Sequence, residues 1–495
     1  MKTTADIAAA TCVVAALPGL TPRLLRAGGS PEPLDAYLAG GGYEEGTGYQ
    51  EGAGYKEGTG YQEGTGYQEG ADYQEGAGYK ESASYKEGAD CQEGTGYQEG
   101  TGHPGGAAGL LGAVERSGLR GRGGAAFPFA VKARAVRRMA RRGQPPVVVA
   151  NGEEGEPTSV KDRWLLRSRP HLVLDGLRLA AAAVGADQAY VYVSDPGAAR
   201  SVTAALREAG QAGRLSLRVT VTVVEPGYVA GEETAAVRAI NGGPAKPTDK
   251  PPRPFEAGVA GRPTLVSNVE TLANLPFIAR QGAAGYRQAG TEASPGTFLA
   301  TITGGGRPPA LYELPYGLPF RELLALHGVA ESGVHGLLMG GYFSGLLGRP
   351  ALDMTLDHES ARAHGAGLGC GALSILGEED CPVAVAASVM AYFARENAGQ
   401  CGSCFNGTAA MSAVLDALRD GGATGDDLAR LRRWSQVLRG RGACGTLDGA
   451  VNLAASLLAQ FPGTVDRHRA GGCDRCGISP FRAARPYEVE PVSLV

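Results

Sequence analysis

Three cysteines near the carboxyl end of the chain have the spacing to bind a metal ion or an iron–sulfur cluster. Cys401 and Cys404 form a Cys-x-x-Cys pair among glycines, and Cys444 follows farther along the chain. Thiolates are favoured ligands of both zinc and iron–sulfur clusters. The usual four-iron cluster has four cysteine ligands, so three thiols leave one position to another ligand. The alternative is three free thiols in the protein interior.

The fourth ligand has several candidates. Ala398 stands where a longer Cys-x-x-Cys-x-x-Cys run would begin. Glu396, Cys473, Cys476 or a solvent species are the alternatives. Cys473 and Cys476 also form a second Cys-x-x-Cys pair with His468 nearby. Two thiols and one imidazole do not complete a metal site of their own.

A glycine-rich segment at residues 121–128 has the composition of a phosphate-binding loop. Its closely spaced glycines let backbone amides approach an anion, and Arg122 and Lys132 supply positive charge. The spacing lacks the usual dinucleotide pattern after a strand, so a plain tight loop is the alternative.

Two acidic segments each follow an expected strand. Residues 151–157 come directly after the apolar run 146–150, and residues 231–234 follow the alternating run 215–224. Ligands of parallel sheets bind at the carboxyl ends of the strands. Carboxylates there repel phosphate, but they accept hydrogen bonds from ribose, flavin or nicotinamide groups. A solvated acidic loop is the alternative for either segment alone.

The elements that must position these loops alternate between strand and helix, which favours an α/β layer with parallel strands. The expected strands are 146–150, 189–193 and 215–224, and the expected helices are 110–117, 171–184, 198–209 and 233–240.

Two further regions differ in pattern. Strands at 298–302 and 337–339 with a helix at 320–327 predict a small α+β domain. Four helices then follow at 383–395, 408–419, 426–439 and 448–461. Sequential helices with short connections pack up-down-up-down, so the loops after the first and third helices lie at one end. This topology brings Cys401 and Cys404 beside Cys444.

Composition narrows the function classes. A chain of 495 residues is too long for one hydrophobic core, so two to four domains are expected. The net charge of −4 gives no basic excess for nucleic acid, and no apolar run has the length of a membrane span. The short apolar stretch at 7–17 is not expected to be a signal peptide. Clustered cysteines then indicate metal binding or redox chemistry rather than disulfides.

Residues 42–101 repeat a Gly- and Glu-rich six-residue unit, which predicts a flexible insertion.

Several stretches together resemble the NADH-binding flavoprotein subunit of respiratory complex I, a family with relatives in NAD-linked hydrogenases and formate dehydrogenases. The resemblance covers nearly all of the chain outside the repeat tract and the last residues. It is carried by Ser117-Gly-Leu-Arg-Gly-Arg-Gly-Gly-Ala-Ala-Phe-Pro128, Lys161-Asp-Arg163, Gly231-Glu-Glu-Thr234 and Asn268-Val-Glu-Thr-Leu-Ala-Asn274.

The resemblance implies a multidomain α/β and α+β fold with a Rossmann-like FMN domain, a small ubiquitin-like domain and a helical bundle that holds an iron–sulfur site. The implied division is an N-terminal segment 1–41, the repeat insertion 42–107, the FMN and NADH domain 108–290, the ubiquitin-like domain 291–375, the four-helix bundle 376–465 and a cysteine-containing tail 466–495.

It also implies roles for individual residues. The cofactor-binding residues would be Gly121, Arg122, Gly123, Gly124, Phe127, Lys132, Asn151, Glu153, Glu154, Tyr228, Gly231, Glu232, Lys250 and Asn268. Glu156 and Glu233 would act at the catalytic centre, and Cys401, Cys404 and Cys444 would bind a [4Fe–4S] or [3Fe–4S] cluster.

The implied activity is oxidation of NADH. A hydride passes from NADH to FMN, and single electrons then pass to the cluster and on to a quinone reductase complex or a ferredoxin-like acceptor. The implied partners are iron–sulfur subunits of an electron-transfer complex. The expected location is the cytoplasm, peripheral to the membrane through those subunits, without nucleic acid or direct membrane insertion.

The chain departs from the family pattern in places. Ala135 and Arg253 stand where two of three aromatic rings would clamp the adenine, and Ala398 replaces the first cluster cysteine. Two alternatives follow from these departures. One is an FMN protein with another redox partner and an altered cluster, and the other is a non-catalytic scaffold that keeps the fold.

Overall fold

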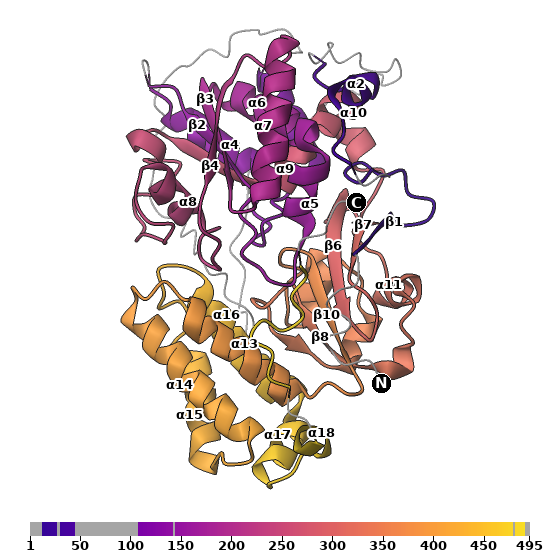
Figure 1. The fold of residues 1–495 in the computed structure, drawn as a ribbon, viewed down its shortest axis with the longest axis vertical. Helices are drawn as coiled ribbons and strands as arrows, with labels where there is room; N and C mark the ends of the chain where they lie inside the picture. The colour runs from indigo at the N-terminus through magenta and orange to yellow at the C-terminus, as the bar shows by residue number, and fades with distance from the viewer. Residues whose placement is uncertain (1–11, 27–29, 45–106, 142–143, 479–480, 491–495) are drawn as a thin grey trace, which may run out of the picture.

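The computed structural model describes residues 12–26, 30–44, 107–141, 144–478 and 481–490, and Figure 1 shows them as three connected parts. An α/β domain lies at one end, a mixed β-sheet with helices lies beside it, and a helical bundle with the tail lies at the other end. Beyond residue 44, the repeat tract expected to be an insertion lies outside the described residues.

The α/β domain is built on a four-stranded sheet in the order β4-β3-β2-β5. All of its strand pairs are parallel, which confirms the expected α/β layer. The strands are β2 (Val147–Asn151), β3 (Gln188–Val193), β4 (Arg218–Val223) and β5 (Thr264–Asn268).

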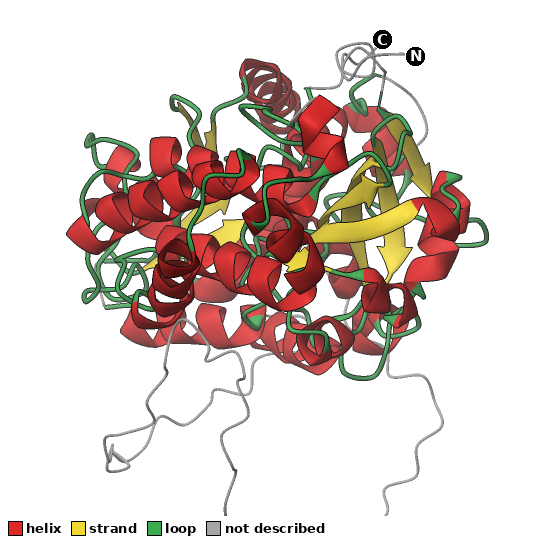
Figure 2. Cartoon of the chain, turned by 90° about the horizontal axis from the view of Figure 1, so that it is seen from below, coloured by secondary structure: helices red, strands yellow, loops and turns green. Residues whose placement is uncertain are grey.

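Helices pack against both faces of this sheet (Figure 2). They follow the strands in alternation, because each crossover between parallel strands needs a connecting segment that returns to the start of the sheet. The helices are α3 (Ala107–Ser117), α4 (Phe129–Met139), α5 (Lys161–Ser168), α6 (Pro170–Val184), α7 (Pro196–Gln211), α8 (Glu233–Ile240), α9 (Val269–Ala273) and α10 (Leu275–Tyr286).

Local sequence signals explain where two of these helices begin and end. Asp195 accepts a hydrogen bond from the Ala198 amide and caps α7, with Pro196 at its first position. Gly185 ends α6 in the left-handed region at φ +78°, where a side chain would be strained.

The second sheet has six strands in the order β1-β7-β6-β10-β8-β9, and α11 (Phe320–His327) and α12 (His358–Ala363) accompany it. The expected strands at 298–302 and 337–339 are found within β6 and β8, and α11 has the expected bounds. Its strands are β1 (Val13–Ala16), β6 (Thr297–Gly304), β7 (Ala310–Pro315), β8 (Val334–Met339), β9 (Leu346–Leu347) and β10 (Ala372–Gly377).

The N-terminal strand β1 was not expected. It pairs in parallel with β7, so Val13 lies opposite Ala310 in the small domain's sheet. The following short helix α2 (Leu34–Ala39) packs instead on the α/β domain, where the Tyr37 hydroxyl donates to Asp175 at 2.8 Å. The amino-terminal segment therefore spans both domains.

The bundle consists of α13 (Pro382–Glu396), α14 (Gly402–Arg419), α15 (Gly425–Val437) and α16 (Thr446–Gln460). Its core is aliphatic, and α17 (Pro462–Arg469) and α18 (Asp474–Ile478) follow at its base (Figure 1). The largest difference from the expected helix bounds is at α14, which begins at Gly402 rather than at residue 408. Cys404 therefore lies in the first turn of that helix rather than in the preceding loop.

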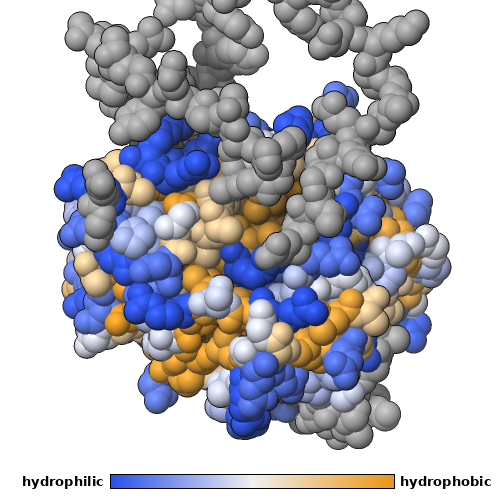
Figure 3. Space-filling model, turned by 90° about the horizontal axis from the view of Figure 1, so that it is seen from above, coloured by the Kyte–Doolittle hydropathy of each residue, from blue (hydrophilic) through white to orange (hydrophobic). Residues whose placement is uncertain are grey.

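No helix among the described residues is long and apolar enough to span a bilayer. On the face shown in Figure 3, hydrophobic residues gather across the lower part and hydrophilic residues cover much of the rest. The large apolar side chains that are exposed come from separate elements, and Phe127 and Val131 at the start of α4 are among them.

Candidate functional site

The glycine-rich segment connects α3 to α4 as a tight loop over the end of β5. The Gly121 amide donates to the Phe127 carbonyl at 2.9 Å, and the Arg122 amide donates to Thr271 Oγ1 at 2.8 Å. Gly124 has φ +117°, a conformation that glycine adopts without strain. A Cβ on Gly123 would lie 3.3 Å from Cβ of Asn268. The loop thus brings backbone close to the carboxyl end of β5, an edge strand of the sheet.

The Arg122 side chain packs into the protein interior. Its guanidinium is buried and donates to the Tyr286 hydroxyl at 2.9 Å and to the Thr297 carbonyl at 3.1 Å. It also lies over the Tyr316 ring, with 4.7 Å between guanidinium carbon and ring centroid. Its charge therefore joins the loop to the second sheet.

Asn268 ends β5 and meets a buried charged cluster. Its amide nitrogen donates to Asp162 at 2.7 Å, and Lys161 Nζ donates to its amide oxygen at 3.3 Å. Lys161 also lies 2.7 Å from Asp162 and 3.0 Å from Glu270. These side chains are almost fully buried, so each charge is compensated inside the protein.

Four residues of this region lie in the stretches that carry the family resemblance but have no role predicted from the sequence: Lys161, Asp162, Glu270 and Thr271. The signal was present, since a Lys-Asp pair opening a helix near the end of a buried strand predicts a compensated charge cluster. The structure shows that this cluster, together with Thr271, positions Asn268 and the glycine loop.

The first acidic loop begins at Asn151, the last residue of β2. The Asn151 side-chain amide donates to the Gly231 carbonyl at 2.7 Å, which ties the two acidic segments together. Glu153 accepts from the Gly227 amide at 3.1 Å and from the Ser194 hydroxyl at 3.2 Å. Burial raises the pKa of Glu153 to about 7.

Glu154 and Glu156 in the same loop have different partners. Glu154 accepts from the Ser159 hydroxyl at 2.5 Å and pairs with Arg163 at 3.1 Å, so its carboxylate anchors the start of α5. Glu156 accepts from the Thr158 hydroxyl at 2.8 Å and from the Tyr342 amide at 3.0 Å. Burial raises the pKa of Glu156 to about 7. Glu156 therefore joins the α/β domain to the small domain.

Tyr228 and Gly231 lie on the second acidic segment beside the bundle. The Tyr228 ring packs edge-on against Tyr392 and Phe393 of α13, with centroid distances of 5.6 Å and 5.4 Å. A Cβ on Gly231 would lie 3.0 Å from the Glu153 carbonyl oxygen. The two acidic loops are therefore in backbone contact, and an aromatic cluster connects them to the bundle.

A group of alternating charges opens α8. Glu232 caps the helix by accepting from the Thr234 amide at 2.8 Å, and it pairs with Lys250 at 2.6 Å. Glu233 pairs with Lys132 at 2.8 Å and with Lys250 at 3.5 Å. Burial acts to raise the pKa of Glu233, but the two lysines outweigh it and lower that pKa.

Phe127 precedes α4 near these charges, and its ring is 38 % exposed. The structure thus places Phe127 and Lys132 on one short stretch, with Lys132 reaching Glu233 across the site. Ala135 and Arg253, at the positions where the resemblance predicts aromatic rings, have no aromatic side chain.

Cys401, Cys404 and Cys444 converge at one end of the bundle, as the helix topology predicted. The Ala443 amide donates to Cys401 Sγ at 3.4 Å, and the Ser403 hydroxyl donates to the Arg441 carbonyl at 2.6 Å. Burial, then the neighbouring thiols of Cys444 and Cys401, raise the pKa of Cys404 to about 12.

This cysteine loop contacts the α/β domain directly. Gln400 donates to the Pro247 carbonyl at 2.7 Å, and Lys246 donates to the Ala398 carbonyl at 3.1 Å. Cys473 and Cys476 do not join this group. They lie with Cys381 and His468 at the start of α13, so they are not available as its fourth ligand.

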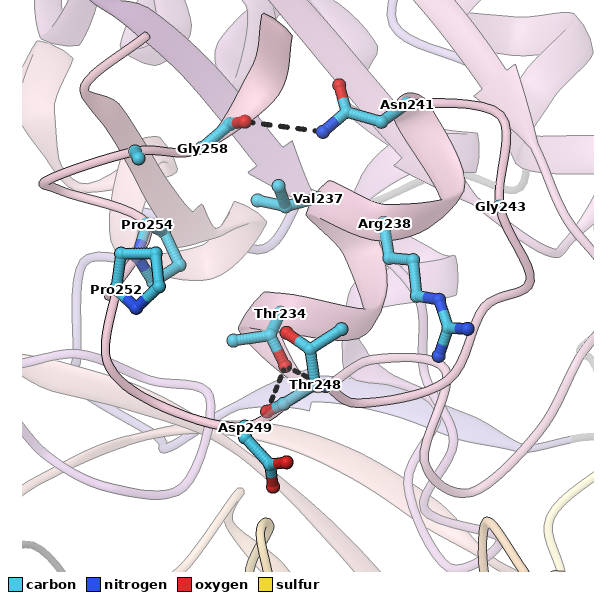
Figure 4. A pocket seen from close by; sticks show the side chains of 11 residues that line it. Thr234, Val237, Arg238, Asn241, Gly243, Thr248, Asp249, Pro252, Pro254 and Gly258 are labelled. Carbon is cyan, nitrogen blue, oxygen red and sulfur yellow. Dashed lines mark hydrogen bonds between the residues drawn. The ribbon is translucent and has the colours of Figure 1, made fainter. Parts of the chain in front are cut away.

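A separate pocket of about 430 Å³ lies between α8 and residues 243–258 (Figure 4). Hydrogen bonds from Asn241 to the Gly258 carbonyl and from the Thr248 amide to Thr234 hold its walls. None of the residues expected to contact FMN or NADH lines it, so it is distinct from the site at the strand ends.

Two family models match the chain. One, described as the Nuo51 FMN-binding domain, matches residues 114–277, which include the glycine loop, both acidic segments and Asn268. The other, described as the NADH-ubiquinone oxidoreductase-F iron-sulfur binding region, matches residues 384–468, which include Cys401, Cys404 and Cys444.

Curated relatives match over most of their length. A subunit of an NADH-quinone oxidoreductase of Rhizobium meliloti (strain 1021) is 34% identical over 72% of this chain and 88% of its own. NADH dehydrogenase [ubiquinone] flavoprotein 1 of Dictyostelium discoideum is 34% identical over 71% of this chain and 77% of its own. NADP-reducing hydrogenase subunit HndC of Solidesulfovibrio fructosivorans is 31% identical over 76% of this chain and 79% of its own.

Among solved structures, a chain of an NAD+-reducing [NiFe]-hydrogenase in the H2-reduced state is similar, with a TM-score of 0.67 and 32% identity. The match covers 73% of this chain and 63% of that chain, so the present chain spans less than two thirds of the hydrogenase chain.

Proposed function

Because this chain belongs to the family of the NADH-binding flavoprotein subunit of NADH-quinone oxidoreductases, we propose that it oxidises NADH on a bound FMN and passes the electrons to an iron–sulfur cluster in its bundle. The observation that carries this proposal is the joint position of two features. A backbone loop with little side-chain bulk meets Asn268, and two linked acidic loops follow β2 and β4, the strands on either side of β3.

The FMN phosphate would bind at the backbone of Gly121, Gly123 and Gly124 with the Asn268 amide. Close approach of backbone amides suits an anion, and Lys161 Nζ holds the Asn268 side chain by donating to its amide oxygen. Asn151 and Glu153 face the adjacent strand ends and would accept or donate hydrogen bonds at the flavin ring. Tyr228, Gly231 and Glu232 would border the ring from the second acidic segment.

NADH would bind on the side of the site where Phe127, Lys132 and Lys250 lie. The exposed Phe127 ring offers a stacking surface, and the lysines offer charge for the pyrophosphate. Glu156 and Glu233 would orient the nicotinamide and its ribose. When bound, FMN supplies the conversion of a two-electron hydride into single electrons, and the protein supplies orientation and electrostatics.

Cys401, Cys404 and Cys444 would hold a [4Fe–4S] cluster, with a solvent species or Glu396 completing it at the place of Ala398. The donor set fits, because three thiols converge at one end of the bundle. The contacts of Gln400 and Lys246 then place this cluster loop against the flavin domain.

Relatives of this chain are named as subunits of quinone oxidoreductases and of a hydrogenase. The electrons would accordingly leave through a ferredoxin-like or other iron–sulfur subunit, toward a quinone reductase complex or a soluble acceptor. Such partners would hold the chain in the cytoplasm at the membrane periphery.

A substitution in the loop tests the FMN site. Gly123→Leu should raise the dissociation constant for FMN at least about a hundredfold, because the side chain enters the space against Asn268. The matched control is Gly210→Leu on α7, where nothing lies within 4 Å of an added Cβ. FMN titration of the flavin-free proteins measures both. Unchanged FMN affinity in Gly123→Leu would refute the site.

An FMN protein with a different electron donor is the second candidate, favoured by Ala135 and Arg253 in place of aromatic rings. Such a protein would bind FMN but would show no flavin reduction by NADH.

A further inference from the structure

A second group of metal-ligand side chains lies at the base of the bundle. The ligand atoms of Cys381, His468, Cys473 and Cys476 all lie within 4.8 Å of one another. Cys381 Sγ is 3.1 Å from His468 Nε2 and 3.9 Å from Cys473 Sγ, and Cys476 Sγ is 3.8 Å from His468 Nε2. Cys381 thus supplies the ligand that the tail pair and His468 lacked in the sequence alone.

These separations match one tetrahedral ion. Zinc bonds of about 2.3 Å to sulfur and about 2.0 Å to nitrogen set ligand separations of roughly 3.8 Å between sulfurs and roughly 3.5 Å between sulfur and nitrogen. The observed sulfur–sulfur distance of 3.9 Å is close to the first value, and the sulfur–nitrogen distances of 3.1 Å and 3.8 Å lie on either side of the second. An iron–sulfur cube holds its ligand atoms farther apart than a single ion does, so the compact group favours the ion.

The surroundings of His468 fix its ring for binding. His468 Nδ1 lies 3.1 Å from the Leu418 carbonyl oxygen, a contact in which the nitrogen donates its proton. This arrangement leaves the unprotonated Nε2 facing the three thiols. Metal-binding histidines commonly have such a carbonyl or carboxylate behind them, because it holds the tautomer and raises ligand basicity.

Two of the cysteines lie at helix starts. Cys381 immediately precedes α13, and Cys473 immediately precedes α18. Arg475 donates to the Asp380 carbonyl at 3.2 Å, which draws α18 toward Cys381.

From this arrangement we infer that Cys381, His468, Cys473 and Cys476 bind one structural zinc ion. The site is separate from the cluster cysteines, because α13 has 15 residues and thus places its two ends about 22 Å apart. It also lies at the border of the matched iron–sulfur region, since Cys381, Cys473 and Cys476 fall outside residues 384–468.

The ion would anchor the tail to the rest of the molecule. It would join the start of α13 to α17 and α18. The tail beyond them contacts the small domain and the α/β domain. There the Tyr342 hydroxyl donates to the Pro486 carbonyl at 2.5 Å, and the Val489 amide donates to the Pro157 carbonyl at 3.0 Å. Zinc binding would therefore hold the tail against the loop that carries Glu156.

Metal analysis of the purified full-length chain tests the inference. We expect about one zinc per chain in addition to iron and FMN. Cys473→Ser should lower zinc at least about tenfold and leave iron and FMN unchanged, whereas Cys444→Ala should lower iron and leave zinc unchanged. Cys12→Ser, at a buried cysteine outside both groups, is the matched control and should change neither metal.

A spectroscopic test covers variants that fold poorly. Cobalt added to the metal-depleted full chain should give the visible absorption of a tetrahedral thiolate site, and Cys476→Ser should abolish that absorption. Three results would overturn the inference: zinc retained in Cys473→Ser, iron in place of zinc at this site, or a disulfide between these cysteines in the native chain. The iron and FMN contents of the same samples report separately on the proposed redox function.

Discussion

At the scale of single residues, the site depends on two carboxyl groups whose pKa values are raised by burial to near neutral pH. Glu153 and Glu156 have only hydroxyl and amide donors within hydrogen-bond distance, and burial raises the pKa of each to about 7. Glu233, by contrast, has two lysine partners and stays ionised. Carboxyls that titrate near neutral pH suit hydrogen bonding to a cofactor whose own charge changes during turnover.

Glu153 makes the stability of the flavin-free protein depend on pH. Its folded pKa of about 7 exceeds the ordinary value of 4.5. Its contribution to stability is therefore full below about pH 4.5 and is lost as pH rises through about 7. Between pH 5 and pH 8, the free energy of unfolding should change by up to about 3 kcal/mol less in Glu153→Gln than in the wild type. Urea unfolding at several pH values measures this difference. Glu115→Gln, at an exposed carboxylate, should leave the pH slope as in the wild type.

Phe127 tests the NADH side of the site. Phe127→Ala should raise the dissociation constant for NADH about tenfold, because one stacking surface is lost, and should leave FMN affinity unchanged. Equilibrium binding of NADH to the FMN-loaded protein measures this. Phe405→Ala, at a ring 41% exposed on another helix, is the control. Equal NADH affinity in Phe127→Ala and wild type would remove Phe127 from the site.

Residue roles were the hardest to predict from sequence. The family resemblance makes Asn268 a cofactor-binding residue, and the structure places it beside Gly123 of the glycine-rich segment. The charge of Arg122 predicts a phosphate contact, whereas its guanidinium bonds to Tyr286 and Thr297. Charge type is visible in a sequence, but the direction of a long side chain depends on partners that are distant in the chain.

At the scale of elements, strand ends and helix starts collect the functional groups. β2 ends at Asn151, β5 ends at Asn268, and α8 begins at Glu233. The sequence predicted α8 within its observed bounds because its charged start and apolar face are local features. It missed β1, because the partner strand β7 is nearly three hundred residues away and leaves no local signal.

The buried Lys161 joins α5 to α9 and should dominate the stability of this junction. Lys161→Met leaves Asp162 and Glu270 without their shared cation and should cost about 3–5 kcal/mol. The thermal midpoint should fall by about 10 °C. Arg134→Met, which breaks an exposed pair with Glu115, should shift the midpoint far less. Similar midpoints for the two variants would contradict the compensated cluster.

At the scale of the whole molecule, α13 connects two different sites. Its first turn follows Cys381, and its far end leads to the loop of Cys401 and Cys404. Tyr392 and Phe393 on the same helix pack against Tyr228 of the flavin domain. The convergence of three cysteines followed from helix order alone. The grouping of Cys381 with His468 could not be predicted from helix order, because the two residues are 87 positions apart and no spacing pattern connects them.

The contact between the cysteine loop and the flavin domain should control internal electron transfer. The double variant Lys246→Ala, Gln400→Ala removes the hydrogen bonds to Ala398 and Pro247. Rapid mixing should show flavin reduction by NADH at the wild-type rate and cluster reduction slowed several-fold. Gln281→Ala, at an exposed glutamine on α10, is the control. Cluster reduction at the wild-type rate in the double variant would show that this contact does not set the transfer distance.

The proposed function depends above all on electron transfer from NADH to the flavin that this chain binds. The most direct measurement is an anaerobic titration of the purified, FMN-loaded full chain with NADH, followed by the visible absorption of the flavin. We expect the flavin band to bleach as NADH is added, with the cluster signal of reduced iron appearing in parallel. A flavin band that persists with excess NADH but bleaches with dithionite would contradict NADH oxidation by this chain.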